Sequence, residues 1–254
     1  MTASTDKIAT FKELIFKSER IVFFTGAGIS TESGIPDFRS PNSGIWTKIS
    51  PIDFQDYLAS EDKRIESWRR WFSGTETMMK AEPNHGHLAV AKLINSGKAT
   101  TVITQNVDNL HQQSGIAASQ VVELHGNAQY AKCLDCEKRY ELDWVKEQLE
   151  QLGTVKPCQD CGGIIKVAFI SFGQQLPADE VRRAEQATLD CDLFIVIGSS
   201  LSVYPAASFP ELATQKDIPL VILNRDPTPL DPIATLTLHE EIGPTMLKVT
   251  DGMN

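Results

Sequence analysis

The chain has 254 residues, enough for one sizeable core or for one core with a small satellite domain. Hydrophobic residues make up 41% and charged residues 22%, which is ordinary for a soluble globular protein. The net charge of −9 argues against a general binder of nucleic acid or anionic membranes, a class that is usually basic.

Targeting signals are not evident in the sequence. Residues 1–16 contain no apolar stretch of the signal-peptide kind. No apolar run approaches the roughly 18 residues needed to span a bilayer. We therefore expect a cytoplasmic protein with no membrane contact.

Apolar patterning predicts helices and strands that alternate along the chain. Helices are expected over 5–19, about 87–95, 178–189, 205–215 and 241–248, and strands over 21–25, 100–104, 120–124, 192–198 and 219–224, with 167–172 as a strand or an extended segment. Continuous apolar strands between helices predict an α/β fold, a Rossmann-like parallel sheet with helices on both faces.

Two segments interrupt this alternation. Residues 36–84 are rich in Pro, Ser, Trp and charge and predict a loop followed by a helical insert. Residues 126–166 contain four paired cysteines and predict a small zinc ribbon. The Rossmann-like core would then comprise 1–35, 85–125 and 167–254, with the whole chain, 1–254, as a single unit.

The four paired cysteines are spaced as metal ligands. Cys133-x2-Cys136 and Cys158-x2-Cys161 are separated by 21 residues. Each C-x-x-C turn can present two thiolates to one ion, and a tetrahedral site closed by four thiolates is structural rather than catalytic. We expect one structural zinc ion, the alternative being four unligated thiols. Cys191 stands alone beside an apolar strand and is expected to be a buried thiol.

The charge of the zinc ribbon bears on its partners. Residues 126–166 contain six Lys or Arg and seven Asp or Glu, a balance that gives no electrostatic footprint for nucleic acid. We expect no specific nucleic-acid binding, and a monomer.

Small and polar residues follow several predicted strands at their carboxyl ends, the edge where open α/β sheets bind ligands. A glycine-rich turn suited to a pyrophosphate follows the first strand, amides and a carboxylate follow the second, and a histidine able to act as a general base follows the third. Polar residues also follow two later strands. In chain order the groups are Gly26–Ser30, Gln105–Asp108, His125, Gly198–Ser200 and Asn224. Plainer interpretations exist, since Asn106 or Asp108 could cap a helix and His125 could bond a loop carbonyl. Together the groups are hard to explain as capping alone.

The order of these motifs resembles that of the sirtuins, which are NAD-dependent protein lysine deacylases. The matching residues are Gly26-Ala-Gly-Ile-Ser, Gly34-Ile-Pro-Asp-Phe-Arg39, Thr104-Gln-Asn-Val-Asp108, His125-Gly126, the two C-x-x-C pairs, Phe172-Gly173 and Gly198-Ser-Ser-Leu. They cover residues 21–226, nearly the whole chain. The resemblance implies that NAD is consumed as a co-substrate and that the segment after the glycine-rich turn is a mobile cofactor-binding loop.

The resemblance also implies roles for individual residues. The phosphates of NAD would be contacted by Ala27, Gly28 and Arg39, with Gly26 in the same turn, while Asp37 orders the loop and Phe38 shields the reactive ribose carbon. Gln105 would contact that ribose, and Asn106, Asp108 and Ile35 would line the nicotinamide pocket. The adenosine half would face Ser199, Ser200, Asn224 and Asp226, with Gly198 a further cofactor-binding residue beside them. Ile170 and Phe172 would line the acyl-lysine tunnel, where the peptide adds as a strand between the two domains.

By the same resemblance, nicotinamide leaves as an oxocarbenium-like ribose forms, and the substrate amide oxygen attacks that carbon to give an alkylimidate. His125 takes a proton from the ribose diol, so that a hydroxyl can attack the imidate carbon, and water completes the reaction. The products are free lysine, nicotinamide and O-acyl-ADP-ribose. The catalytic residues would be His125, Asn106 and Gln105.

Several positions depart from the family pattern. Lys166-Val167-Ala168 stands where sirtuins often carry Arg-Pro-Asp, Gln174 replaces a usual Glu, and Asn109 replaces a usual Gly. The first two lie around the peptide cleft, so they bear on peptide choice rather than on chemistry. The helical insert carries Arg69 and Arg70 but no Tyr of the kind that accompanies acidic acyl chains. We expect neutral acyl groups, acetyl first.

Two other functions remain open at this point. A mono-ADP-ribosyltransferase or NAD glycohydrolase would transfer ADP-ribose to a side chain or to water, and a non-catalytic NAD-sensing scaffold would use the zinc module for contacts. His125 favours the deacylase over a transferase, because ADP-ribosyl transfer need not activate a ribose hydroxyl. The intact set of Gln105, Asn106, Asp108 and His125 argues against the scaffold.

Overall fold

The computed structural model describes residues 2–37 and 50–252. Its larger part is a six-stranded sheet in which all neighbouring strands are parallel, in the order β3-β2-β1-β7-β8-β9. These strands are β1 (Ile21–Thr25), β2 (Ala99–Thr104), β3 (Val121–Glu123), β7 (Leu193–Ile197), β8 (Leu220–Leu223) and β9 (Leu236–Leu238). The strand order reverses between β1 and β7, and open α/β sheets bind ligands at such a switch point.

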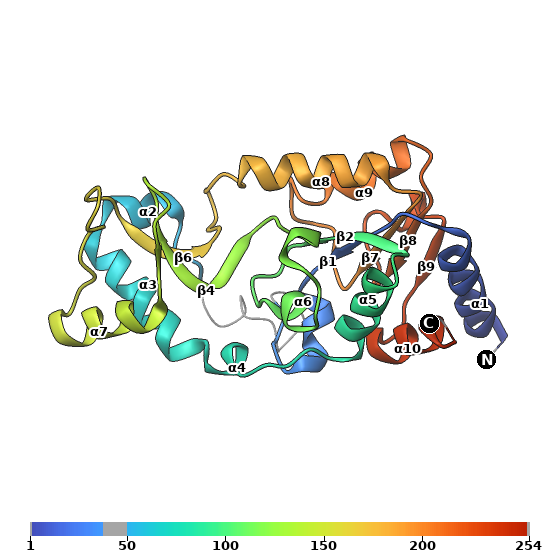
Figure 1. Cartoon of the computed structure of the whole chain (residues 1–254), viewed down its shortest axis with the longest axis horizontal. Helices are drawn as coiled ribbons and strands as arrows, with labels where there is room; N and C mark the ends of the chain where they lie inside the picture. The colour runs from blue at the N-terminus through green and yellow to red at the C-terminus, as the bar shows by residue number, and fades with distance from the viewer. Residues whose placement is uncertain (1, 38–49, 253–254) are drawn as a thin grey trace.

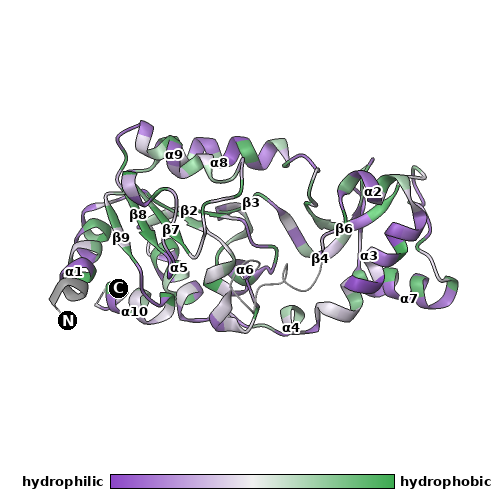
Figure 2. Cartoon of the chain, turned by 180° about the vertical axis from the view of Figure 1, so that it is seen from behind, coloured by the Kyte–Doolittle hydropathy of each residue, from purple (hydrophilic) through white to green (hydrophobic). Residues whose placement is uncertain are grey.

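Helices cover both faces of this sheet (Figure 1). The helices α1 (Thr2–Lys17), α5 (His85–Asn95) and α10 (Ile242–Thr250) pack on one face, and α8 (Ala178–Asp190) and α9 (Ser208–Gln215) pack on the other. Ile21 and Phe23 of β1 belong to the first core, and Val22 and Phe24 to the second. Because successive side chains of a strand point to opposite faces, a strand covered on both faces is apolar throughout. Figure 2 shows these hydrophobic strands between the helices and confirms the predicted architecture.

Two strands differ from the sequence prediction. β9 is not predicted, because its three residues are too few to show a period and two of them are only half-buried at the sheet edge. The segment predicted as strand or extended over 167–172 forms β6 (Ile165–Phe169), which begins two residues earlier and lies in a second sheet.

This second sheet is antiparallel and small. Its order is β5-β4-β6, with β4 (Gly126–Cys133) and β5 (Arg139–Tyr140). Beside it lie α7 (Leu142–Leu152) from the cysteine segment and α2 (Phe54–Ala59) and α3 (Glu61–Gly74) from the helical insert. Trp68 of α3, Val145 of α7 and Val167 of β6 share one buried core. The insert and the cysteine segment therefore pack as one small unit, and the expected boundary at residue 166 falls inside β6.

The remaining elements are short helical turns that connect the others. They are η1 (Ala27–Ser33), α4 (Glu76–Met79), α6 (Leu110–Gln113), η3 (Ala118–Gln120) and η4 (Asp231–Ile233). Within 2–37 and 50–252, no helix combines the length and the apolar character needed to cross a membrane.

Candidate functional site

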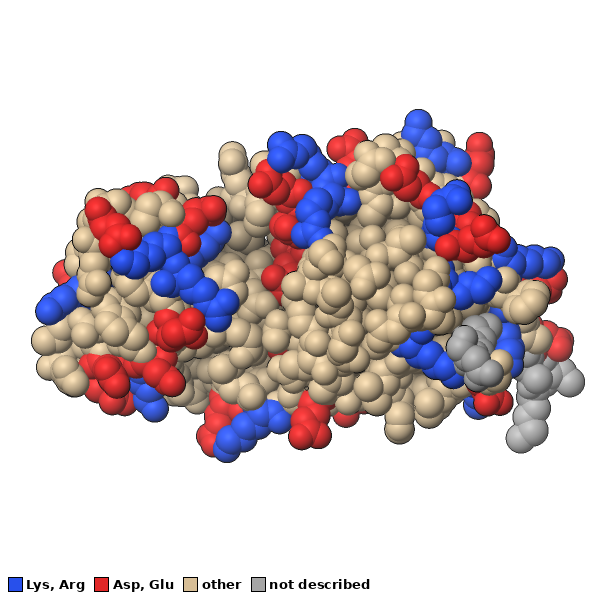
Figure 3. All heavy atoms as spheres, in the orientation of Figure 1, with Lys and Arg blue, Asp and Glu red and all other residues tan. Residues whose placement is uncertain are grey.

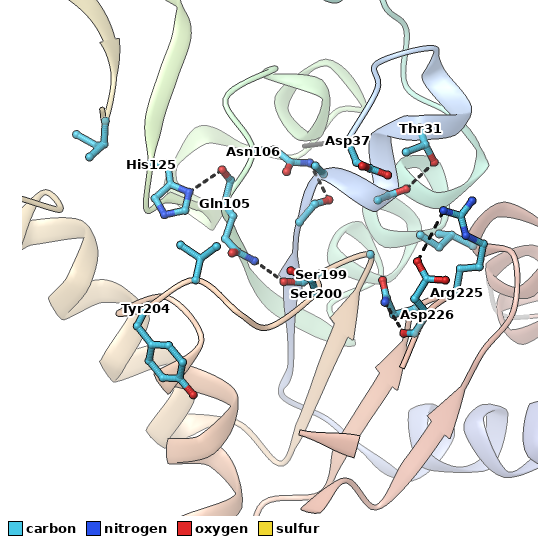
Figure 4. Close-up of a pocket in the computed structure, with 18 of the residues that line it drawn as sticks. Thr31, Asp37, Gln105, Asn106, His125, Ser199, Ser200, Tyr204, Arg225 and Asp226 are labelled. Carbon is cyan, nitrogen blue, oxygen red and sulfur yellow. Dashed lines mark hydrogen bonds and ion pairs between the residues drawn. The ribbon is translucent and has the colours of Figure 1, made fainter. Parts of the chain in front are cut away.

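A cavity of about 610 Å³ opens at the carboxyl edge of the large sheet, beside the point where the strand order reverses. Figure 4 shows that its side chains come from the loops after several different strands. The sequence-predicted residues that line it are Gly26, Ala27, Gly28, Asp37, Gln105, Asn106, His125, Ile170, Phe172, Gly198, Ser199, Ser200, Asn224 and Asp226. A cavity of this size is in the range that holds a cofactor or a small ligand.

Two of the residues expected around the cofactor, Asp108 and Ile35, are not among those that line this cavity. Asp108 is buried behind the cavity wall, where its Oδ2 accepts a hydrogen bond from Ser30 Oγ at 2.7 Å. Ile35 does not line the cavity, and its backbone N donates to Ser30 O at 3.3 Å. Phe38 and Arg39 fall outside the described residues.

The turn after β1 is pressed against the loop after β7. Gly26 N donates to Ile197 O at 3.1 Å, and Gly28 N donates to Gly198 O at 2.8 Å. A Cβ atom on Gly28 would lie 2.7 Å from Gly198 Cα, closer than a side chain allows, and Gly198 itself has a φ of +64°. The two backbones are thus in direct contact, and both loops line the cavity.

Gln105 and Asn106, at the carboxyl end of β2, are held in place by side-chain hydrogen bonds. Gln105 Nε2 donates to Ser199 Oγ at 2.8 Å. Asn106 Nδ2 donates to Gly26 O at 3.1 Å and to Ser30 Oγ at 3.2 Å. These bonds join the loops after β1, β2 and β7, so the two amides form a fixed wall of the cavity.

His125 follows β3 and lines the same cavity. Its Nδ1 lies 3.0 Å from the backbone O of Gln105. A carbonyl only accepts hydrogen bonds, so the ring proton resides on Nδ1 and Nε2 keeps its lone pair. Burial lowers the pKa of His125, and the hydrogen bond to Gln105 O partly raises it. The imidazole is therefore neutral near physiological pH, and the bond to the loop carbonyl fixes the orientation of its ring, with Nε2 free to accept a proton.

A buried polar cluster behind the cavity wall is not evident from the sequence. It includes the Asp108–Ser30 pair and a contact of 2.8 Å between Thr25 Oγ1 and His111 Nε2. The rings of His87 and His111 lie 5.1 Å apart. Burial lowers the pKa of His87 to about 4, holds that of His111 well below its ordinary value and raises that of Asp108. The two histidines therefore stay neutral. Nothing in the sequence around His87 in α5 or His111 in α6 distinguishes them from ordinary core residues.

The far end of the cavity is formed by the loops after β7 and β8. Ser200 Oγ lies 2.9 Å from Ser202 Oγ, and Asn224 Nδ2 donates to the backbone O of Asp226 at 2.7 Å. Hydroxyl and amide groups both donate and accept, so this end suits a ligand rich in hydroxyls, such as a ribose.

Further lining residues escaped the sequence reasoning. They are Thr31, Glu32, Val203, Tyr204, Arg225, Glu240, Glu241 and Ile242, among others. Most lie inside the predicted strand-end segments but were not singled out there, and Glu240 to Ile242 reach the cavity because α10 begins there. For Glu240 to Ile242, the available signal in the sequence was their position at the start of a predicted helix that follows the last strands.

The segment after β6 closes one side of the cavity. Ile170 N donates to His125 O at 2.7 Å, and Phe172 O accepts from Phe54 N at 2.9 Å. The Phe172 side chain is 47% exposed and lines the cavity with Ile170. Apolar side chains at the rim of a cavity with a neutral imidazole in its wall suit a ligand that carries an apolar group.

The four paired cysteines form a second site, in the small unit and away from the cavity. Their Sγ atoms all lie within 4.8 Å of one another, with Cys133 and Cys161 3.4 Å apart and Cys136 and Cys158 3.6 Å apart. Tetrahedral zinc with Zn–S bonds of about 2.3 Å places its sulfurs about 3.8 Å apart, so the four thiols fit one ion. The Tyr140 hydroxyl donates a hydrogen bond to Cys158 Sγ at 3.1 Å, a contact that favours the thiolate that zinc requires. Four protein ligands leave no open position, so the site is structural.

Comparisons with known proteins agree with this arrangement. The profile of the Sir2 family matches residues 26–205. An NAD-dependent protein deacetylase of Rhodopseudomonas palustris is 52% identical over 234 residues, which are 92% of this chain and 92% of that protein. A solved structure of Sir2 with a p53 peptide and NAD+ has a TM-score of 0.84 at 38% identity, covering 96% of this chain and 97% of the other. A structure of a Sir2 variant with a deacetylated p53 peptide and 3′-O-acetyl ADP ribose has a TM-score of 0.87 at 39% identity, covering 97% and 98%.

Removal of one paired cysteine should remove the zinc ion. We expect the protein to carry one zinc per chain and Cys136→Ser to lose most of it with a lower thermal midpoint, because three thiolates leave the tetrahedron incomplete. Cys191→Ser is the matched control, since Cys191 is a thiol outside the cluster, and it should keep its zinc. Elemental analysis of the purified proteins gives the stoichiometry. Equal zinc content in the two variants would contradict the assigned ligands.

Proposed function

The chain belongs to the Sir2 family, and we propose that its cavity carries out NAD-dependent deacylation of lysine side chains in proteins or peptides. The observation that carries the proposal is the His125 imidazole, fixed by the Gln105 carbonyl so that Nε2 remains an acceptor in the cavity wall. The products are free lysine, nicotinamide and O-acyl-ADP-ribose. The acyl group is thus transferred to ADP-ribose rather than to water directly.

The residues present fit NAD along the length of the cavity. The hydroxyls and amide of Ser199, Ser200 and Asn224 would hold the adenosine half, and the turn from Gly26 to Gly28 would lie under the pyrophosphate. Gln105 and Asn106 would face the nicotinamide ribose. When bound, NAD supplies the ribose carbon that accepts the acyl oxygen and the nicotinamide that leaves.

His125 would act on a proton of the ribose hydroxyls. Nε2 accepts that proton, and the positive charge that develops on the ring is stabilised through Nδ1–H by the Gln105 carbonyl. Burial favours the neutral imidazole before the reaction. Nε2 can therefore accept a proton from the ribose without the ring first having to lose one. The buried cluster around Asp108 and Ser30 fixes the Asn106 side chain, because Ser30 Oγ accepts from Asn106 Nδ2 and donates to Asp108.

The acyl-lysine would enter beside Ile170 and Phe172, the apolar side of the cavity. An extended peptide can add to backbone groups at such a position. Arg69 and Arg70 lie on α3, outside the residues that line the cavity, and Arg70 donates to Ser50 O at 2.9 Å. Neither places a positive charge at the described cavity wall, which supports neutral acyl groups with acetyl first.

We further propose that the enzyme is a cytoplasmic monomer without specific nucleic-acid binding. Four thiols assembled as zinc ligands suit a reducing compartment. Figure 3 shows Lys and Arg interspersed with Asp and Glu over the face that it displays. This pattern and the net charge of −9 give no extended basic surface on that face for a phosphate backbone.

Replacement of the proposed base tests the function. His125→Ala should lower the deacetylation rate about 10²- to 10⁴-fold, the range expected for loss of a general base. Its affinity for NAD, measured by calorimetry, should change only a few-fold, because the other cavity residues remain. The matched control is His85→Ala, which removes an exposed imidazole outside the cavity and should keep full activity. Full activity in His125→Ala would overturn the assignment.

The pH dependence of kcat/KM should follow the protonation of His125, the proposed base, whose pKa is lowered by burial. The ordinary pKa of 6.5 is reduced by burial, so kcat/KM should fall only on the acid side, with its midpoint below 6.5, as Nε2 becomes protonated. Rate measurements with an acetyl-lysine peptide check this, with samples returned from acid to neutral pH to separate protonation from unfolding. An acid limb with its midpoint above 6.5, fully reversible, would contradict a desolvated neutral base.

A further inference from the structure

The outer edge of β6 faces away from the rest of its sheet. β6 pairs only with β4, as the terminal strand of the small sheet. Leu134 N donates to Ile164 O and Ile170 N donates to His125 O, so the even-numbered residues of this stretch bond toward β4. Bonding direction alternates from residue to residue in an antiparallel pair, and the odd-numbered carbonyls therefore point to the outer edge. Such carbonyls ordinarily attract another strand.

Side chains satisfy three successive carbonyls on this edge. Ile165 O accepts from the Tyr57 hydroxyl at 2.9 Å. Val167 O and Phe169 O both accept from Lys166 Nζ, at 3.2 Å and 2.5 Å. One lysine thus spans the last two edge carbonyls of β6.

The surroundings of Lys166 favour this arrangement. Its side chain is buried, at 3% exposure, and Nζ lies 4.1 Å from the centroid of the Phe169 ring. Burial, with the facing Lys132, lowers the pKa of Lys166 to about 7, and Lys132 itself pairs with Glu137. Both protonation states of an amine keep at least two N–H donors, so the two hydrogen bonds survive the titration.

The edge changes character immediately after these bonds. Up to Phe169 its carbonyls are occupied, and from Ile170 onward the chain lines the cavity. Ile170 is also tied to the base-bearing loop through its bond to His125 O. A shift of Phe169 would therefore be passed directly to the segment that receives the substrate.

We propose that Lys166 is a positioning residue for the acyl-lysine substrate. By holding the carbonyls of Val167 and Phe169 it fixes residues 170–172 against the cavity and sets the point at which a substrate strand can begin to pair. The inference rests on the proposed function, because it takes the substrate to be an acyl-lysine peptide. It assigns a role to a position where the sequence departs from the arginine usual in sirtuins.

Three variants test the role. Lys166→Met keeps the stem and removes the donors, Lys166→Arg keeps donors, and Tyr57→Phe removes the donor to Ile165 O at the other end of the same edge. Steady-state kinetics with an acetyl-lysine peptide and NAD give both KM values. Hydrogen exchange of residues 165–176 without substrates gives a readout that needs no activity. Should the Met variant fail to fold, Lys166→Gln replaces it, because its shorter amide cannot span both carbonyls.

We expect Lys166→Met to raise the peptide KM about tenfold or more, with the NAD KM within about twofold, and to speed exchange over 170–174. Lys166→Arg should recover most of the peptide KM, and Tyr57→Phe should leave it within about twofold. A peptide KM in the Met variant no higher than in Tyr57→Phe, or equal rises in both KM values, would overturn the proposal. If the wild type makes no deacylated product, the proposed function fails, while unchanged exchange over 170–174 alone would still refute the role of Lys166.

Discussion

The structure depends on the contact between the backbone after β1 and the backbone after β7. Gly28 N donates to Gly198 O at 2.8 Å, a distance that only two glycines permit here. This contact lies at the reversal of strand order, so the loops of the neighbouring strands diverge from it on either side and leave a crevice. The amides after β2 and the hydroxyls after β7 meet across it through the Gln105–Ser199 hydrogen bond. The cavity is therefore lined by two closely packed glycine-containing loops with polar side chains beside them, an arrangement suited to a pyrophosphate between two riboses.

The chemistry is set by burial as much as by residue identity. His125 has a backbone carbonyl as its orienting partner, and desolvation keeps its ring neutral. Behind the wall, His87 and His111 are also kept neutral by burial, so this region contributes hydrogen bonds without a fixed positive charge beside Asp108. The small unit bears on one side of the cavity. Its four-cysteine ribbon supports β6 through β4, and β6 leads into the segment that carries Ile170 and Phe172.

Much of this was predictable from the sequence, for identifiable reasons. Strands buried on both faces are continuously apolar, and paired C-x-x-C turns have a spacing that few other sites share. Asn109, which departs from a usual Gly, has a φ of +66°, a conformation that Asn tolerates. What could not be predicted depends on contacts between distant segments. Asp108 is buried and bonded to Ser30, and Lys166 satisfies an edge that appears only once β6 joins the small sheet.

The central claim is that the acyl group leaves lysine by transfer to ADP-ribose. The most direct test incubates the zinc-loaded protein with NAD and an acetyl-lysine peptide and quantifies every product by mass spectrometry. The account predicts nicotinamide, deacetylated peptide and O-acetyl-ADP-ribose in equal amounts. Nicotinamide together with free ADP-ribose or ADP-ribosylated protein, and an unchanged peptide, would contradict it and would indicate a glycohydrolase or an ADP-ribosyltransferase.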